Sequence, residues 1–281
     1  MLTKRDELVL QEIKDWTEEL QTHTPYEFQL TYSQWLEQTI SIIPEGIRLN
    51  YINKLDEWLF HVSSWLQDSN VQQKSKKQIL TSARAFYGDI ERIEDLKHLT
   101  IDQLNYLAEQ KLAKQRLYAF IQGGLTGTGS SLFMSLDMPV LVLLNLRTVQ
   151  LTAMSYGYEI NSPFELMLSL KVFHAASLPK QWQSQGWNYL MNELDTHEHS
   201  FFYEGNEKVL DETWFEKNIN QLLKTILLVL MKKSVSKRNP LISMFLGGVM
   251  NYQFTRQTAE YAKRFYQYRY LREKGRDFDE S

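Results

Sequence analysis

Cysteine is absent from this chain of 281 residues, and its absence excludes several classes of chemistry. Without thiols the protein has no disulfides, no thiolate metal ligands and no cysteine nucleophile. A composition without cysteine also fits a reducing compartment such as the cytoplasm. Residues 1–7 lead into polar, tryptophan-bearing sequence rather than into the apolar core of a signal peptide. We therefore expect neither secretion nor cleavage.

A large net charge is also lacking, because 31 basic and 34 acidic residues give a formal charge of −3. The whole-chain charge therefore gives no reason to expect a nucleic-acid partner. The charge is unevenly distributed, however, since residues 232–276 carry eleven basic and two acidic side chains. This segment is either a surface for an anionic partner such as a phospholipid leaflet, or a helix face balanced by the acidic remainder. The candidate membrane-binding residues are Lys232, Lys233, Lys237 and Arg238.

Alternating patterns typical of strands do not occur, and nearly the whole chain has helical periodicity. Thr100 and Gln103 form a capping box that predicts a helix start near Thr100. Ser162 and Pro163 open another helix in a similar way, and Gly157 is placed to end the preceding one. We expect an all-α, multi-helix bundle in a single domain. Further helices are expected over residues 47–66, 211–235 and 241–271.

Charge is scarcest between Leu117 and Tyr158, where Asp137 and Arg147 are the charged residues in a stretch rich in glycine. No glycine here is followed by the lysine of a phosphate-binding loop, so nucleotide binding is not expected. Gly123, Gly127 and Ser131 recur every four residues and would form one smooth helix face beside Gly124. A matching stripe follows at Asn145, Thr148, Thr152 and Ser155. The two faces predict a closely packed central helical hairpin; the alternative is a flexible glycine loop.

The same stretch is too polar for a membrane span, because Asp137 interrupts it and a mid-bilayer charge costs about 2.5–3.5 kcal/mol. We expect a buried or interfacial hairpin instead. Pro139 is predicted in the first turn of the second helix, with Asp137 as its N-terminal cap and Arg147 paired with an acid elsewhere. The alternative is an enzyme in which Asp137 and Arg147 are polar groups of an apolar pocket.

Other chemical motifs are weak. His197 and His199, with Glu193 or Glu204, have spacing that a polar loop explains as well as a metal site does. His174 fits a buried core position better than a catalytic base. Ser130 and Ser131 have no neighbouring histidine or Gly-x-Ser-x-Gly turn. We expect no metal and no cofactor.

Two ordered sets of residues carry a family resemblance. The first comprises Gly123-Gly124-Leu-Thr-Gly127, Leu136-Asp137-Met-Pro139, Arg147-Thr-Val-Gln150 and Tyr156-Gly157-Tyr158. The second comprises residues 240–245, Gly247-Gly248, Asn251, Phe254, Ala259, Ala262, Tyr266, Arg269 and Leu271. Together they cover residues 89–274 and resemble the EcsC family.

The resemblance implies a bacterial accessory or regulatory protein associated with an ABC transporter at the cytoplasmic face of the membrane, without a defined reaction. The expected partners are transporter subunits and an anionic membrane surface. The alternative is a hydrolase-like enzyme acting on a lipid or peptide. We divide the chain into a helical region at 1–88, an EcsC-like helical domain at 89–276 and an acidic tail at 277–281. The candidate functional or packing residues are Gly123, Gly124, Gly127, Asp137, Arg147, Asn251 and Arg256.

Overall fold

The computed structural model describes residues 2–22, 61–66, 69–126, 131–197 and 240–279. These ranges consist of helices joined by short turns, with no β-strand among them. The all-α prediction is confirmed. The elements are α1 (Lys4–Thr22), α4 (Asn70–Ala83), the 3-10 helix η1 (Glu94–His98), α5 (Ile101–Thr126), α6 (Ser131–Ser155), α7 (Pro163–Ser177), α8 (Lys180–His197) and α10 (Pro240–Asp279). Residues 61–66 are also helical. The helix expected at 211–235 and most of that expected at 47–66 lie outside the described residues.

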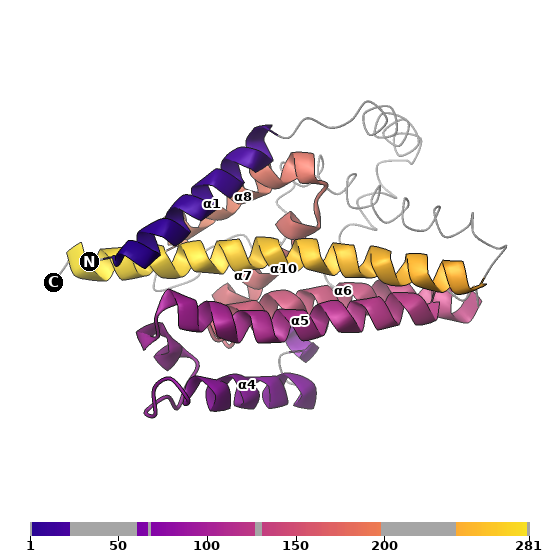
Figure 1. Ribbon diagram of the computed structural model, residues 1–281, viewed down its shortest axis with the longest axis horizontal. Coiled ribbons are helices and arrows are strands. Elements are labelled where there is room, and N and C mark those ends of the chain that lie inside the picture. Colours follow the sequence, from indigo (N-terminus) through magenta and orange to yellow (C-terminus); the bar gives the residue numbers. More distant parts are fainter. Residues whose placement is uncertain (1, 23–60, 67–68, 127–130, 198–239, 280–281) are drawn as a thin grey trace.

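The 40-residue helix α10 organises the arrangement of the other helices. In Figure 1 it runs the length of the molecule, with α1 and α8 on one side and α5, α6 and α7 on the other. Helix α4 lies beyond α5 and contacts both α5 and α6. None of the described helices has a stretch that is both long and apolar enough to span a membrane.

Helix boundaries follow local sequence signals in three places. The Thr100 backbone N–H donates to Gln103 Oε1 at 2.9 Å, and the Gln103 N–H donates back to Thr100 Oγ1 at 3.4 Å. Ser162 caps α7 immediately before Pro163. Gly157 has φ +87°, a left-handed conformation that favours glycine, just after α6 ends. The predicted capping box, the Ser162-Pro163 start and the glycine stop are confirmed.

The predicted start of α6 at Pro139 is wrong. Helix α6 begins at Ser131 and contains Pro139 in its interior. Asp137 therefore lies within the helix and cannot be its N-terminal cap. An interior proline removes one backbone hydrogen bond and commonly kinks a helix, but helix-forming residues such as Leu132, Met134 and Leu136 extend the helix before it.

One hydrophobic cluster joins all parts of the described chain. Val9 and Ile13 of α1 and Ile79 of α4 are buried in the same cluster as residues of α5 through α10. Trp16 stands edge-on to Trp187 and Tyr261, with ring centroids 5.3 and 5.5 Å away. The described parts of residues 1–88 thus share a core with the rest of the chain.

Helices α5 and α10 approach each other closely at glycines. A Cβ atom on Gly123 would lie 2.3 Å from the Gly247 carbonyl oxygen, and one on Gly248 would lie 2.9 Å from the Phe120 carbonyl oxygen. Asn251 Nδ2 donates to Gln122 Oε1 across the same contact at 3.0 Å. The partner of Gly123 is therefore α10 rather than the next helix in the chain, which differs from the predicted hairpin. Gly127 lies outside the described residues.

The predicted small-residue stripe on α6 is fully buried. Its hydroxyls and the Asn145 NH₂ group donate within the helix, whereas Asn145 Oδ1 has no hydrogen-bond partner among the described residues. Asn145 Nδ2 donates to the Leu141 carbonyl, and the Thr148 hydroxyl donates to the Leu144 carbonyl, both at 2.8 Å. Thr152 and Ser155 bond in the same way to the carbonyls four residues before them. The three hydroxyls of the stripe are thus bonded within their own helix.

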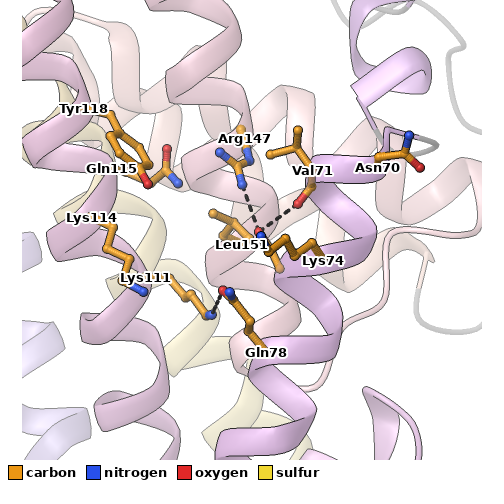
Figure 2. Close-up of a pocket in the computed structure, with 11 residues that line it drawn as sticks. Asn70, Val71, Lys74, Gln78, Lys111, Lys114, Gln115, Tyr118, Arg147 and Leu151 are labelled. Carbon is orange, nitrogen blue, oxygen red and sulfur yellow. Dashed lines mark hydrogen bonds between the residues drawn. The ribbon is translucent and has the colours of Figure 1, made fainter.

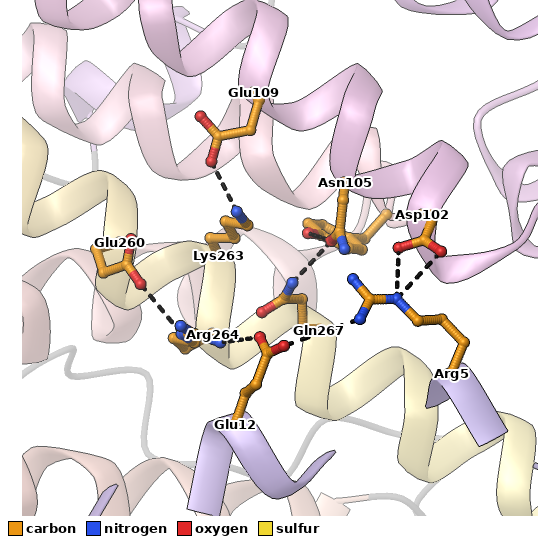
Figure 3. A network of polar contacts seen from close by, with 10 residues as sticks. Arg5, Glu12, Asp102, Asn105, Glu109, Glu260, Lys263, Arg264 and Gln267 are labelled. Atoms are coloured by element: carbon orange, nitrogen blue, oxygen red, sulfur yellow. Dashed lines mark hydrogen bonds and ion pairs between the residues drawn. The ribbon is translucent and has the colours of Figure 1, made fainter. Parts of the chain in front are cut away.

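Many basic residues of α10 pair with acids from other helices. Lys263 Nζ lies 2.7 Å from Glu109, and Lys274 Nζ lies 2.8 Å from the buried Asp6 carboxylate. Figure 3 shows Lys263 and Arg264 reaching toward acids of α5 and α1, beside the hydrogen bond from Gln267 to Asn105. For the described part of residues 232–276, this arrangement favours the alternative of a helix face balanced by the acidic remainder.

The most buried of these pairs joins α7 to α10. Arg269 donates two hydrogen bonds to Glu165, at 2.6 and 2.8 Å, and its guanidinium lies 3.8 Å from the centroid of Tyr158. Burial alone would lower the pKa of Arg269, but the charge and hydrogen bonds of Glu165 raise it above its ordinary value. This bidentate geometry fixes α10 against α7.

The two neighbouring glycines of α5 give a matched pair of predictions. Gly123→Ala should lower the free energy of unfolding by about 1–3 kcal/mol, because its Cβ would strike a backbone oxygen. Gly124→Ala should be neutral or stabilise by about 0.5–1 kcal/mol, because its Cβ would lie at an ordinary 3.6 Å from Met244 O and alanine favours helix. Urea denaturation measures both; equal effects would contradict the close α5–α10 approach.

Removing the buried carboxylate should destabilise the fold strongly. Glu165→Gln removes the bidentate partner of the buried Arg269 and leaves Glu273, 3.1 Å from its Nε, as the remaining acid. We expect a loss of about 3 kcal/mol in the free energy of unfolding. Adding Arg269→Met should recover part of this loss. Asp195→Asn is the control, because its pair with Arg272 involves an exposed carboxylate and should cost less than about 1 kcal/mol. Similar losses for the Glu165 and Asp195 variants would count against the structural importance of the buried pair.

Candidate functional site

A pocket opens between α4, α5 and α6, with a volume of about 510 Å³. This volume is in the range of sites that bind small molecules. Figure 2 shows side chains from the three helices converging around it. The lining residues are Asn70, Val71, Lys74, Ser75, Gln78, Lys111, Lys114, Gln115, Tyr118, Arg147 and Leu151.

All charged side chains among the described residues that line the pocket are positive. Four of its residues are cationic: Lys74 from α4, Lys111 and Lys114 from α5, and Arg147 from α6. No aspartate or glutamate is among the described residues that line it. Like charges so close together repel one another and raise the energy of the folded state unless an anion joins them.

Arg147 forms part of the pocket floor. Its Nη2 donates to Ser75 Oγ at 2.8 Å, while its Nε is buried and has no hydrogen-bond partner among the described residues. Burial lowers the pKa of Arg147, and the hydroxyl of Tyr118 partly opposes that effect. The predicted partner acid for Arg147 is not found within the described residues. A buried guanidinium N–H without an acceptor is a ready donor for a ligand oxygen.

Lys111 is the most buried cation of the pocket, with 7% of its surface exposed. Its Nζ donates to Gln78 Oε1 at 3.1 Å, as Figure 2 shows. Burial, reinforced by the charges of Lys114 and Arg147, lowers its pKa from 10.5 to about 8. The lysine remains mostly protonated at neutral pH, but the free pocket disfavours that charge.

The remaining polar groups divide into floor and rim. Gln115 is 3% exposed, and its Oε1 has no hydrogen-bond partner among the described residues. A glutamine amide can present either its oxygen or its NH₂ by rotating its last torsion. Lys74, Lys114 and Tyr118 are exposed at the rim. A ligand would therefore meet exposed cations first and buried donors below them.

This arrangement suits anion binding better than catalysis. Ser75 Oγ donates its proton to the Val71 carbonyl at 3.0 Å and accepts from Arg147, so the hydroxyl is not activated by a base. The described lining contains neither histidine nor carboxylate that could act as general acid or base. The chemistry offered is several N–H donors around one cavity.

The residues predicted from sequence are scattered. Arg147 lines the pocket, whereas Asp137 lies ten residues earlier on α6, about 15 Å along the helix axis. The two positions are therefore separated by almost three turns of the helix. Arg256 is exposed on α10. Gly123, Gly124 and Asn251 belong to the α5–α10 contact, while Gly127, Lys232, Lys233, Lys237 and Arg238 lie outside the described residues.

The histidine candidates do not form a site within the described chain. His174 is buried on α7, and burial lowers its pKa to about 3, so it is neutral at physiological pH. Glu193 pairs with Lys171 at 2.5 Å rather than facing an open site. His199 and Glu204 lie outside the described residues. No cluster of three or more metal-binding side chains occurs among the residues that are described.

Sequence reasoning missed most of the pocket. No recognised motif contains Lys74, Lys111, Lys114, Ser75 or Gln115, because each occupies an ordinary helix position. Lys111, Lys114 and Gln115 recur at three- and four-residue spacing on α5, which was a usable sign of a shared face. Arg147 was found because charge is so scarce around it.

Comparisons with known proteins give a family and two relatives. A sequence model of the EcsC protein family matches residues 7–271, a range that includes α1 and α4 as well as the residues carrying the resemblance. The chain is 27% identical over 138 residues to the Bacillus subtilis (strain 168) "Uncharacterized protein YdbA", covering 48% of this chain and about half, 49%, of that protein. It is 21% identical over 203 residues to "Protein EcsC" of the same organism, covering 72% of this chain and 79% of that protein. No solved structure matches.

Like-charge repulsion in the free pocket predicts that Lys111→Met stabilises the protein at neutral pH by about 1 kcal/mol. Between pH 8 and 10.5 the unfolded chain keeps a proton that folded Lys111 loses, so the stability of the native protein rises with pH in that window. The advantage of the variant should therefore shrink toward pH 10.5.

Urea denaturation at pH 7 and pH 10.5 measures this difference between the variant and the native protein. Lys77→Met is the control, because Lys77 is exposed on α4 outside the pocket and its removal relieves no repulsion among the pocket cations. A Lys111 variant that is less stable than the native protein at both pH values would show that the lysine is structurally favourable.

Proposed function

This chain belongs to the EcsC protein family, and we propose that it is an accessory or regulatory protein of a bacterial ABC transporter, acting at the cytoplasmic membrane face by binding a ligand. The observation that carries this proposal is the pocket between α4, α5 and α6, with four cations and no carboxylate in its described lining. Such a pocket can bind and release an anionic group without changing it. Binding of this kind is what a regulatory protein requires.

The transporter is proposed on the basis of the family. The resemblance links EcsC-type proteins to operons that encode an ABC transporter, and the family match extends over residues 7–271. The cytoplasmic location is proposed from that context together with the lack of cysteine. Attachment through Lys232, Lys233, Lys237 and Arg238 stays a prediction, because these residues lie outside the described part of the chain.

The alternative of a hydrolase-like enzyme receives less support. It required Asp137 and Arg147 to meet in one concave site, and their separation along α6 is about 15 Å. Ser75, the hydroxyl beside Arg147, gives its proton to a backbone carbonyl. A ligand-binding role needs neither a nucleophile nor a base, so it fits the observed groups directly.

Photo-crosslinking from intact bacterial membranes tests the proposed partner. A photoreactive residue would replace Leu8 on α1, Tyr106 on α5 or Tyr252 on α10, because these positions are exposed and lie on different helices. We expect at least one position to capture a subunit of an ABC transporter, identified by mass spectrometry. A strain lacking that transporter is the control and should lose the adduct. Absence of any transporter adduct from all three positions would contradict the proposal.

A further inference from the structure

An apolar ridge continues from the pocket along α5. Leu117, Tyr118, Ile121 and Leu125 have 55%, 49%, 48% and 59% of their surfaces exposed. Their spacing of three and four residues from Tyr118 onward places them along one side of the helix. Large apolar side chains gathered at a surface are typical of contacts with a partner or a membrane.

The ridge and the pocket share a boundary. Tyr118 lines the pocket and also belongs to the ridge, while Lys114 lies one turn before it on the same face. In Figure 1 helix α4 runs beside the first part of α5 and ends before the distal part of that helix. The pocket therefore forms where α4 covers α5, and the exposed ridge follows where α4 no longer does.

We propose that the pocket and the ridge together bind an anionic phospholipid, with the headgroup phosphate among the four cations and the adjoining acyl region against α5. The assignment rests on the proposed function, because it names the ligand of the same pocket. Phosphate oxygens would accept from Arg147 Nε, which is buried without a partner among the described residues, and from the ammonium groups of Lys74 and Lys111. The anion would also relieve the repulsion among these cations.

The exposed ridge favours a lipid over a soluble phosphate as the ligand of the pocket. A soluble anion would use the pocket alone and would give the exposed side chains of Leu117 and Ile121 no role. In a membrane lipid the negative phosphate lies next to apolar chains. Along α5 the cations of the pocket likewise lie next to the apolar ridge. Charge complementarity and the continuity of the two surfaces thus select a membrane lipid.

The test uses the purified full chain and protein-free vesicles. Vesicles contain phosphatidylcholine alone or mixed with phosphatidylglycerol, and binding is measured by co-sedimentation. We expect binding to the anionic vesicles and not to phosphatidylcholine alone. Lys74→Gln combined with Lys114→Gln should weaken that binding by about tenfold or more, since each cation near an anionic leaflet contributes substantially.

Matched variants separate the site from the general surface. Lys14→Gln with Lys77→Gln removes the same charge from exposed positions outside the pocket and should bind as the native protein does. Leu117→Ser with Ile121→Ser should lose vesicle binding, while Leu8→Ser with Tyr87→Ser, which changes exposed apolar residues elsewhere, should keep it. Circular dichroism confirms that each variant is folded.

Soluble probes distinguish the source of the phosphate. Inorganic phosphate and glycerol 3-phosphate are titrated by calorimetry, and the ridge variant should bind them as the native protein does. Equal weakening by both lysine pairs would overturn the inference in favour of diffuse attraction. Binding of soluble phosphates without vesicle binding would overturn the lipid assignment. Because no transporter is present, these failures are separate from a failure to capture a transporter subunit in membranes.

Discussion

Helices α5 and α10 approach each other so closely that one added carbon at Gly123 would strike a backbone oxygen of the other helix. This contact fixes the position of α10 along α5, and other interactions along the long helix depend on that position. Lys263 then reaches Glu109, Arg269 reaches Glu165, and Lys274 reaches the buried Asp6. A shift of α10 by one residue would move its side chains by about 1.5 Å and 100° and break all three pairs.

The pairing along α10 changes how the charge of the sequence is interpreted. The basic C-terminal segment suggested a surface for anions, but its described residues largely neutralise acids of α1, α5, α7 and α8. The opposite situation exists at Lys111 and Arg147, where cations gather without acids in the described lining. A count of charges along the chain cannot distinguish these two cases, because it does not say which side chains meet.

Short-range features of the fold were predictable, since capping at Thr100 and Ser162 and the turn at Gly157 each depend on a few neighbouring residues. The start of α6 was wrongly predicted at Pro139, because proline is allowed in the first turn of a helix and also, at an energetic cost, in its interior. The small face at Gly123 was recognised, but its partner α10 lies more than a hundred residues away in sequence. Helix packing over such separations leaves no local pattern in one sequence.

The residues of the pocket were also difficult to predict from local patterns in the sequence. Its cations come from three helices, and of these cations Arg147 alone was a candidate from the sequence. What identifies the pocket is an energetic conflict: the lowered pKa of Lys111 and the buried Nε of Arg147 both make the free protein less stable than a neutral lining would. A fold that needed this region only for packing would be more stable with apolar residues there. The conflict is therefore best explained by an anion that resolves it when bound.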